Sequence, residues 1–415
     1  MSLAEVPILL ILVGLAAYIV LAGADFGAGV WELSARGEGG ARLREHCHRA
    51  MGPVWEANHV WLIFALVVCW TAYPEAFGSI FSTLVAPLLL AAIGIILRGA
   101  GYIVRSVTDS RWGSTLFAVS SILTPFALGT AIGGIASGRV PVGNAEGDLV
   151  TSWTGPTSIL IGTLAVAFSA YLAATYLAGD AARIRSPDLA RAFRARAIGA
   201  GLVAGALALG GLGVLAADAE DLFDGLTEGA GLAAVAVSAL AGVVTLGLVL
   251  RERFEPARFT AALAVTAIVA GWGIAQSPEI LPGLTIEEAA ADRSILIATL
   301  VAVAGGTVIL APSLALLFGL TLRGRFDPGA ATAPAPVAPV PPSAGRGGSR
   351  PLAIAAPAAL AAGLPLTLIF DGGLGLALGV VCLLAFVATG FVVLAHSLVS
   401  APTGDQPRTV SHRSR

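Results

Sequence analysis

The chain has 415 residues, of which 56% are hydrophobic and only 12% are charged, and its formal net charge is -2. Soluble domains carry about 25% charged residues, so this composition excludes a soluble globular protein and indicates an integral membrane protein. The three cysteines lie far apart, form no metal-ligand pattern and exclude a disulfide framework. We expect no nucleic-acid partner.

Long apolar runs follow one another along the chain, and each has about the 20 residues that a membrane-spanning helix needs. They lack the period-two alternation of a membrane barrel. The sequence therefore predicts an all-α fold, a polytopic membrane helix bundle. We count eleven candidate spans, at residues 6–33, 53–72, 77–103, 115–138, 155–179, 197–217, 229–250, 258–276, 294–322, 351–369 and 372–399.

The arginines predict the orientation of these spans. All 24 basic residues are arginines, and when the loops are assigned to alternate sides, 22 fall on one side. Only Arg139 and Arg293 fall on the other side. Arginine-rich loops face the cytoplasm, so we expect an external N-terminus and a cytoplasmic C-terminus. The first run lacks the basic stretch that precedes a cleaved signal, so we expect a retained helix.

The composition changes sharply after the ninth span. Residues 327–350 are rich in proline and alanine, which is typical of an extended linker without a packed core. We therefore divide the chain into a nine-span membrane domain at 1–326, a cytoplasmic linker at 327–350, a two-span appendage at 351–400 and a disordered polar tail at 401–415. The appendage is expected to pack on the complex as a fused accessory element.

Two carboxylates stand inside predicted spans, Asp25 in the first and Glu56 near the start of the second. The predicted orientation makes these spans antiparallel neighbours and places both acids nearer the cytoplasmic surface. Ionisable groups are costly inside a membrane and usually face a protein interior or a water path. The two acids are therefore a candidate proton relay. The alternative is that Glu56 only stabilises the N-terminus of its helix through the helix dipole.

The residues around these acids leave further alternatives open. The glycines at 23–29 either let helices pack closely or loosen a turn and admit water. Arg98, near the cytoplasmic end of the third span, either extends its charge to the interface or pairs with one of the acids. His59 shares a helical face with Glu56, but the spans offer no second histidine or cysteine at a useful spacing. We therefore predict no metal site and no haem bound by this chain alone.

Several stretches together resemble subunit II of cytochrome bd-type quinol oxidases. They are residues 23–29 (Gly-Ala-Asp-Phe-Gly-Ala-Gly), 52–58 (Gly-Pro-Val-Trp-Glu-Ala-Asn), 60–62 (Val-Trp-Leu), 98–105 (Arg-Gly-Ala-Gly-Tyr-Ile-Val-Arg) and 277–291. The resemblance covers about residues 1–326, in the family's order and spacing. The first two motifs together are specific, whereas either alone is weak.

The resemblance implies a fold of two four-helix bundles plus one further helix, in a bacterial plasma membrane. It implies a subunit of a complex that oxidises quinol and reduces oxygen to water, not catalytic alone, paired with a homologous subunit I. That partner would hold the haem b and haem d groups and the quinol-oxidising loop, and membrane lipid or a structural quinone would accompany the complex. Asp25 and Glu56 would form a cytoplasmic proton path, supported by Trp55, Asn58 and Arg98.

The sequence also departs from the family pattern. Glu56 stands where aspartate is more usual, Ala22 and Ile103 replace acids, and His59 stands where other side chains occur. A different class of function, a proton-coupled transporter using Asp25 and Glu56, is the alternative. Transporters of that kind show inverted repeats and helices broken at mid-membrane, whereas these acids are expected nearer one surface.

Overall fold

The computed structural model describes residues 2–35, 37–51, 55–107 and 111–322, together with isolated positions between 355 and 389. By contacts the chain divides into two units, residues 1–327 and 328–415. The linker at 327–350, the tail, and most of the two spans predicted at 351–369 and 372–399 lie outside the described residues. The domain boundaries expected from the sequence stay a prediction.

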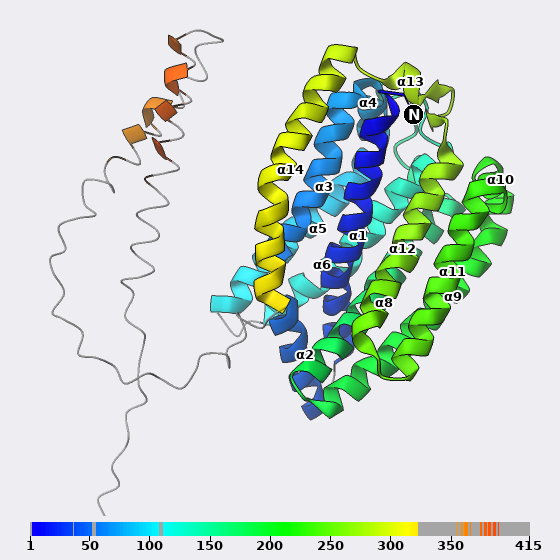
Figure 1. Cartoon of the computed structure of the whole chain (residues 1–415), viewed down its shortest axis with the longest axis vertical. Coiled ribbons are helices and arrows are strands. Elements are labelled where there is room, and N and C mark those ends of the chain that lie inside the picture. The colour runs from blue at the N-terminus through cyan, green and yellow to red at the C-terminus, as the bar shows by residue number, and fades with distance from the viewer. Residues whose placement is uncertain are drawn as a thin grey trace, which may run out of the picture. The chain divides into compact units, whose positions relative to one another are not determined.

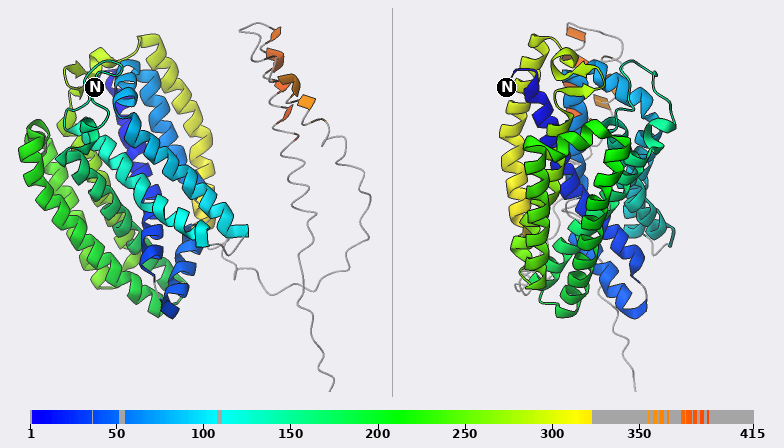
Figure 2. Two further views of the ribbon diagram at one scale, coloured as in Figure 1. Left: turned by 180° about the vertical axis from the view of Figure 1, so that it is seen from behind. Right: turned by 90° about the vertical axis from the view of Figure 1, so that its right-hand side faces the viewer.

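Long helices build the first unit. Helix α1 packs on α8 and also contacts α3, α6 and α12. Helix α6 packs on α5 and on α8, α8 packs on α9, and α11 packs on α12. A ninth long helix, α14 (Arg293–Leu322), runs beside α3 along the outside (Figure 1, Figure 2). The other bounds are α1 (Glu5–Ser34), α3 (Trp55–Ala72), α5 (Val85–Val107), α6 (Arg111–Ala136), α8 (Pro156–Arg183), α9 (Pro187–Asp218), α11 (Gly229–Leu250) and α12 (Phe254–Gln276).

The all-α membrane class is confirmed. Six of the described helices are each long and apolar enough to cross a membrane, and α4 with α5 would make a seventh as one broken span. The described apolar parts of α3 and α14 are shorter, at residues 58–72 and 293–308. The exact number of spans therefore stays a prediction.

The third predicted span, residues 77–103, is not one continuous helix. Helix α4 (Pro74–Thr83) ends at Leu84, and α5 leaves it at an angle of 82°. Pro87 lies in the first turn of α5 and has no N–H to donate to the Thr83 carbonyl, so the helix restarts there instead of continuing. The expected run was wrong at this point because an apolar sequence hides a break between helices.

Short elements lie at both ends of the bundle. Helix α2 (Gly37–Met51), which the sequence left as a basic loop, lies at the opposite end from the N-terminus and α4 (Figure 1). It docks through His46, whose Nε2 donates to the Leu177 carbonyl oxygen at 3.1 Å, and burial lowers the pKa of His46. The other short elements are α7 (Thr151–Thr154), α10 (Glu220–Thr227), β1 (Glu279–Leu281), β2 (Leu284–Thr285) and α13 (Ile286–Ala289).

A capping box opens α13. The Thr285 hydroxyl accepts from the Glu288 N–H, and the Glu288 carboxylate accepts from the Thr285 N–H at 3.0 Å. Strands β1 and β2 form a small antiparallel pair just before it. Gly283 between them has φ of 73°, a left-handed conformation that glycine adopts without strain.

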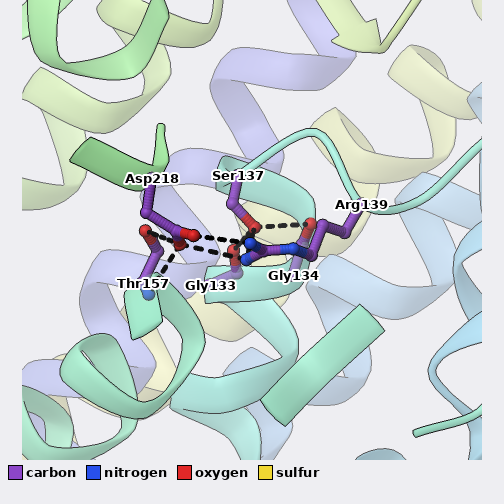
Figure 3. A network of polar contacts seen from close by, with 6 residues as sticks. All are labelled: Gly133, Gly134, Ser137, Arg139, Thr157 and Asp218. Carbon is purple, nitrogen blue, oxygen red and sulfur yellow. Dashed lines mark hydrogen bonds and ion pairs between the residues drawn. The ribbon is translucent and has the colours of Figure 1, made fainter. Parts of the chain in front are cut away.

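One ion pair joins the segment after α6 to the end of α9, at the N-terminal end of the bundle. Arg139, which follows α6, donates to both carboxylate oxygens of Asp218 at the end of α9, at 3.0 and 2.6 Å. The same carboxylate accepts from the N–H and the hydroxyl of Thr157, in the first turn of α8 (Figure 3). Three helix ends thus meet on one carboxylate, although the sequence placed Arg139 and Asp218 in separate loops.

Replacing Asp218 by alanine is expected to lower the thermal unfolding midpoint of the purified complex. The change leaves the Arg139 guanidinium and the Thr157 donors without their acceptor, at a cost of about 1–3 kcal/mol. Asp188→Ala is the matched control, because Asp188 pairs with Arg191 at 2.6 Å on an open surface, with both side chains at least 67% exposed. Its effect should stay within about 0.5 kcal/mol. Equal midpoints for the two variants would contradict the role of Asp218 as a clamp.

Candidate functional site

Asp25 and Arg98 form a buried ion pair between α1 and α5. Arg98 Nε donates to Asp25 Oδ2 at 3.0 Å, and its Nη2 lies 2.7 Å from Oδ1 while donating to the Asp25 carbonyl oxygen at 2.8 Å. Each side chain is only 1% exposed. Arg98 therefore does not extend its charge to the interface. Of the two alternatives that the sequence left open, the structure shows the second, in which Arg98 pairs with an acid of the first span.

The guanidinium of Arg98 is also held from its other sides. Its Nη1 donates to the Ser121 hydroxyl at 2.8 Å, and that hydroxyl donates to the Phe117 carbonyl oxygen at 2.7 Å. The rings of Phe26 and Phe117 lie with their centroids 4.9 and 4.1 Å from the guanidinium carbon. A planar cation is stabilised by aromatic faces in a desolvated site. The arrangement fixes one conformation of Arg98.

The glycines of α1 provide the space for this arrangement. A methyl group added at Gly29 would overlap the Ser121 hydroxyl, and one added at Gly27 would overlap the backbone carbonyl of Ser169 on α8. Helix α1 continues unbroken from Glu5 to Ser34 through this stretch. Close packing, and not a loosened turn, is what the glycines at 23–29 provide in the structure.

Helix α3 meets α1 one turn away from Asp25. The Asn58 side-chain amide donates to the Leu21 carbonyl oxygen at 3.3 Å, and Asn58 is 3% exposed. His59 lies between the Tyr18 and Phe26 rings, with centroid separations of 5.9 and 6.0 Å. The start of α3 is therefore beside the Asp25 region, as expected from the sequence.

Glu56 and Trp55 begin α3, but their side chains lie outside the part of the chain that the structure describes. Glu56 is the second residue of the helix and precedes Asn58 by half a turn. Glu56 is thus two positions before a residue, Asn58, that contacts α1. The expected pairing of Glu56 with Asp25 stays a prediction, as does the effect of Ile103, whose side chain is likewise not described.

Several buried polar atoms of this region lack a hydrogen-bond partner among the described residues. They include the Tyr18 hydroxyl, Asn58 Oδ1 and Asp25 Oδ1, the last of which contacts Arg98 without accepting an aligned hydrogen bond. Unsatisfied polar atoms in an interior are rare, and ordered water commonly binds them. The polar cluster formed by Asp25, Arg98, Asn58 and Ser121 is therefore suited to holding water inside an apolar bundle.

Sequence reasoning did not identify Ser121, Phe117 or Tyr18. The sequence did carry a signal for Ser121, because three hydroxyl side chains, those of Ser120, Ser121 and Thr124, stand close together within an apolar run. In the structure all three are fully buried. Nothing in the spacing of Phe117 and Tyr18 distinguishes them from other core aromatic residues. Among the described residues, His, Cys, Asp and Glu form no group that could hold a metal ion.

The described residues define a polytopic, helical membrane protein with a charged pair buried between two of its long helices. A family model described as cytochrome bd terminal oxidase subunit II matches residues 3–321, so the chain belongs to this family. The resemblance seen in the sequence motifs is thereby confirmed.

Curated relatives match part of the chain. The chain is 29% identical over 140 residues to cytochrome bd-I ubiquinol oxidase subunit 2 of Escherichia coli K12, covering 31% of this chain and 36% of the relative. It is 28% identical over 134 residues to cytochrome bd ubiquinol oxidase subunit 2 of Bacillus subtilis 168, covering 31% and 38%. The chain thus spans little more than a third of the length of these curated relatives.

The fold is similar to a chain in the structure of bd oxidase from Geobacillus thermodenitrificans. The TM-score is 0.62 at 23% sequence identity, and the match covers 78% of this chain and 99% of that chain. At this identity the likeness concerns the fold alone.

Proposed function

We propose that this chain is the non-haem subunit of a membrane terminal oxidase that oxidises quinol and reduces oxygen to water. In this proposal it pairs with a haem-bearing subunit I in a bacterial plasma membrane, with its N-terminus outside and its C-terminus in the cytoplasm. It supplies scaffold and a proton path from the cytoplasm, and the redox chemistry takes place in the partner. Family membership over residues 3–321 supports this assignment.

The observation that carries the proton path is the polar cluster around Asp25. A buried acid and a buried arginine pair between α1 and α5, and an unsatisfied amide oxygen lies on α3 where that helix contacts α1. Such groups are costly in a membrane interior and are usually found along proton and ion pathways. Water held on these atoms would connect the start of α3 with the protein interior.

Within this path the two acids have different roles. An arginine side chain keeps its positive charge in proteins. Arg98 contacts both carboxylate oxygens of Asp25, through Nε and Nη2, and its Nη2 also donates to the Asp25 carbonyl oxygen. Asp25 therefore acts as a fixed countercharge that holds the path in place, while Glu56, in the first turn of α3, accepts protons from the cytoplasmic side. Trp55 and Asn58 support this entry point.

We place the haem b and haem d groups in the partner subunit, because the chain belongs to the subunit II family of cytochrome bd oxidases.

The transporter alternative is less well supported. A coupling-cation site would need negative charge that is not already balanced, and the Arg98 guanidinium balances the charge of Asp25. The bend between α4 and α5 lies at the N-terminal end of the bundle, where Tyr73 bonds the Ala4 carbonyl, and not at mid-membrane. Purification of the chain without a haem-bearing partner, together with solute transport, would favour the transporter.

The test of the proton path is Glu56→Gln in the complete complex. We expect oxygen-dependent quinol turnover to fall about tenfold or more, because a group that transfers protons is lost, while assembly and haem content stay unchanged. Glu56→Asp should keep most of the turnover, because it retains the carboxylate. Glu45→Gln is the matched control, since Glu45 pairs with Arg49 on the surface of α2 with 57% of its side chain exposed. Full turnover in Glu56→Gln would remove Glu56 from the mechanism.

A further inference from the structure

A groove of about 440 Å³ opens on the outside of the bundle between α1, α8 and α9. Its walls include Ala167 and Ala170 of α8, Gly199 and Val203 of α9, and Trp31 near the end of α1. The groove exists because these α8 and α9 positions carry small side chains. A methyl group added at Gly199 would meet nothing within 4 Å. The volume is in the range of about 300–1,000 Å³ that is usual for small-ligand sites.

Arg196 lines one end of the groove without a carboxylate partner. Its Nη1 donates to the Ala192 carbonyl at 3.0 Å, and its guanidinium carbon lies 5.8 Å from the Trp31 ring centroid. No carboxylate oxygen of the described residues lies within 4.0 Å of it. The neighbouring arginines differ: Arg191 pairs with Asp188, and Arg258 pairs with Asp180 at 2.7 Å.

The position of Arg196 along α9 is that of a membrane boundary. It is the last charged residue before the apolar run 197–217. The part of α9 that precedes it, from Pro187, carries three other charged side chains, those of Asp188, Arg191 and Arg194. Trp31 lies at the same level, held by a hydrogen bond from its Nε1 to the Ala170 carbonyl oxygen at 2.8 Å. Tryptophan is enriched at this level of a membrane. The cation therefore lies where lipid phosphates lie, and the apolar walls lie where acyl chains lie.

We propose that this groove binds one anionic phospholipid, with its headgroup phosphate on Arg196 and one acyl chain along Ala167, Gly199 and Val203. Charge complementarity selects the occupant. An unpaired guanidinium favours a headgroup whose net charge is negative over one in which a choline cation cancels the phosphate charge, and arginine matches phosphate oxygens with two parallel donors. A neutral quinone would use the apolar walls but not the cation. The site goes beyond the proposed oxidase function and does not depend on the proton path.

The test uses the purified, delipidated complex in phosphatidylcholine nanodiscs, with phosphatidylglycerol added and bound lipid measured by native mass spectrometry. We expect Arg196→Gln to weaken phosphatidylglycerol retention about tenfold, the loss of roughly one charge-assisted contact. Gly199→Leu should weaken it as well, because the first carbon of the new side chain meets nothing within 4 Å and the rest of it occupies the groove. Arg191→Gln removes the same charge from the same helix but should leave retention unchanged, since Arg191 lies outside the groove.

Three results would overturn the proposal. If Arg196→Gln retains phosphatidylglycerol as the unmodified complex does, the cation does not bind the headgroup. If Gly199→Leu displaces phosphatidylcholine or quinone while Arg196→Gln has no effect, the groove takes a neutral occupant. Should Arg196→Gln fail to assemble, Gly199→Leu decides, because retention of phosphatidylglycerol with a filled groove also contradicts the proposal.

Discussion

Asp25→Asn is expected to destabilise the complex by about 3–5 kcal/mol, and more than Arg98→Gln does. The asymmetry comes from the chemistry of the two side chains. When Arg98 is removed, the Asp25 carboxyl can take up a proton and become neutral. When Asp25 is neutralised, the guanidinium stays charged at any physiological pH, in a site where it is 1% exposed. The double variant Asp25→Asn with Arg98→Gln should recover much of what Asp25→Asn loses.

The measurement is the yield of assembled complex and its thermal unfolding midpoint. The Asp188–Arg191 pair is the matched control, since the same amide substitutions in that exposed pair should change the midpoint very little. Turnover of the double variant then separates two roles of Asp25. If Asp25 is a countercharge, the double variant regains turnover together with stability; if Asp25 itself carries protons, it regains stability alone. A greater loss in Arg98→Gln than in Asp25→Asn would contradict the fixed-charge assignment.

The sequence was sufficient for the fold class because membrane helices are determined by a local property. Long apolar runs and the distribution of arginines depend on composition along the chain, and the runs at 6–33 and 229–250 agree with α1 and α11 within one residue at each end. The break at Leu84 was not predictable in the same way. Pro87 is a signal in the sequence for the restart of the helix, but the direction of α4 is set by tertiary contacts such as that of Tyr73 with Ala4, which the sequence does not show.

The candidate site was predictable in its residues but not in its pairing. Asp25, Asn58 and Arg98 stood out because polar groups within apolar runs are rare. Which of them meet depends on how α1, α3 and α5 rotate about their axes, and that is decided by the small-residue contacts between the helices. The ion pair of Arg139 with Asp218 could not be predicted for the same reason, because the two residues are 79 positions apart in the sequence.

Gly27→Ala is expected to be among the most damaging substitutions in α1, although it adds a single methyl group. The methyl carbon would overlap the backbone carbonyl of Ser169 and lie 2.7 Å from the Ala173 methyl on α8. A backbone carbonyl cannot rotate away as a flexible side chain can, so α1 and α8 would have to separate. Overpacking of this kind costs about 1–3 kcal/mol or more, and the neighbouring Asp25 and Phe26 would move with the helix.

Gly23→Ala is the control for this prediction, because it makes the same change one turn earlier in the same helix. There the added methyl would meet its nearest atom, Ser169 Oγ, at 3.5 Å, an ordinary contact. Alanine is also favoured over glycine in a helix interior by about 0.5–1 kcal/mol, so this variant should be neutral or slightly stabilising. The unfolding midpoint of the complex is the readout for both. If the two variants behaved alike, α1 and α8 would not be in close backbone contact at Gly27, and the glycines would have to be explained by flexibility of the helix.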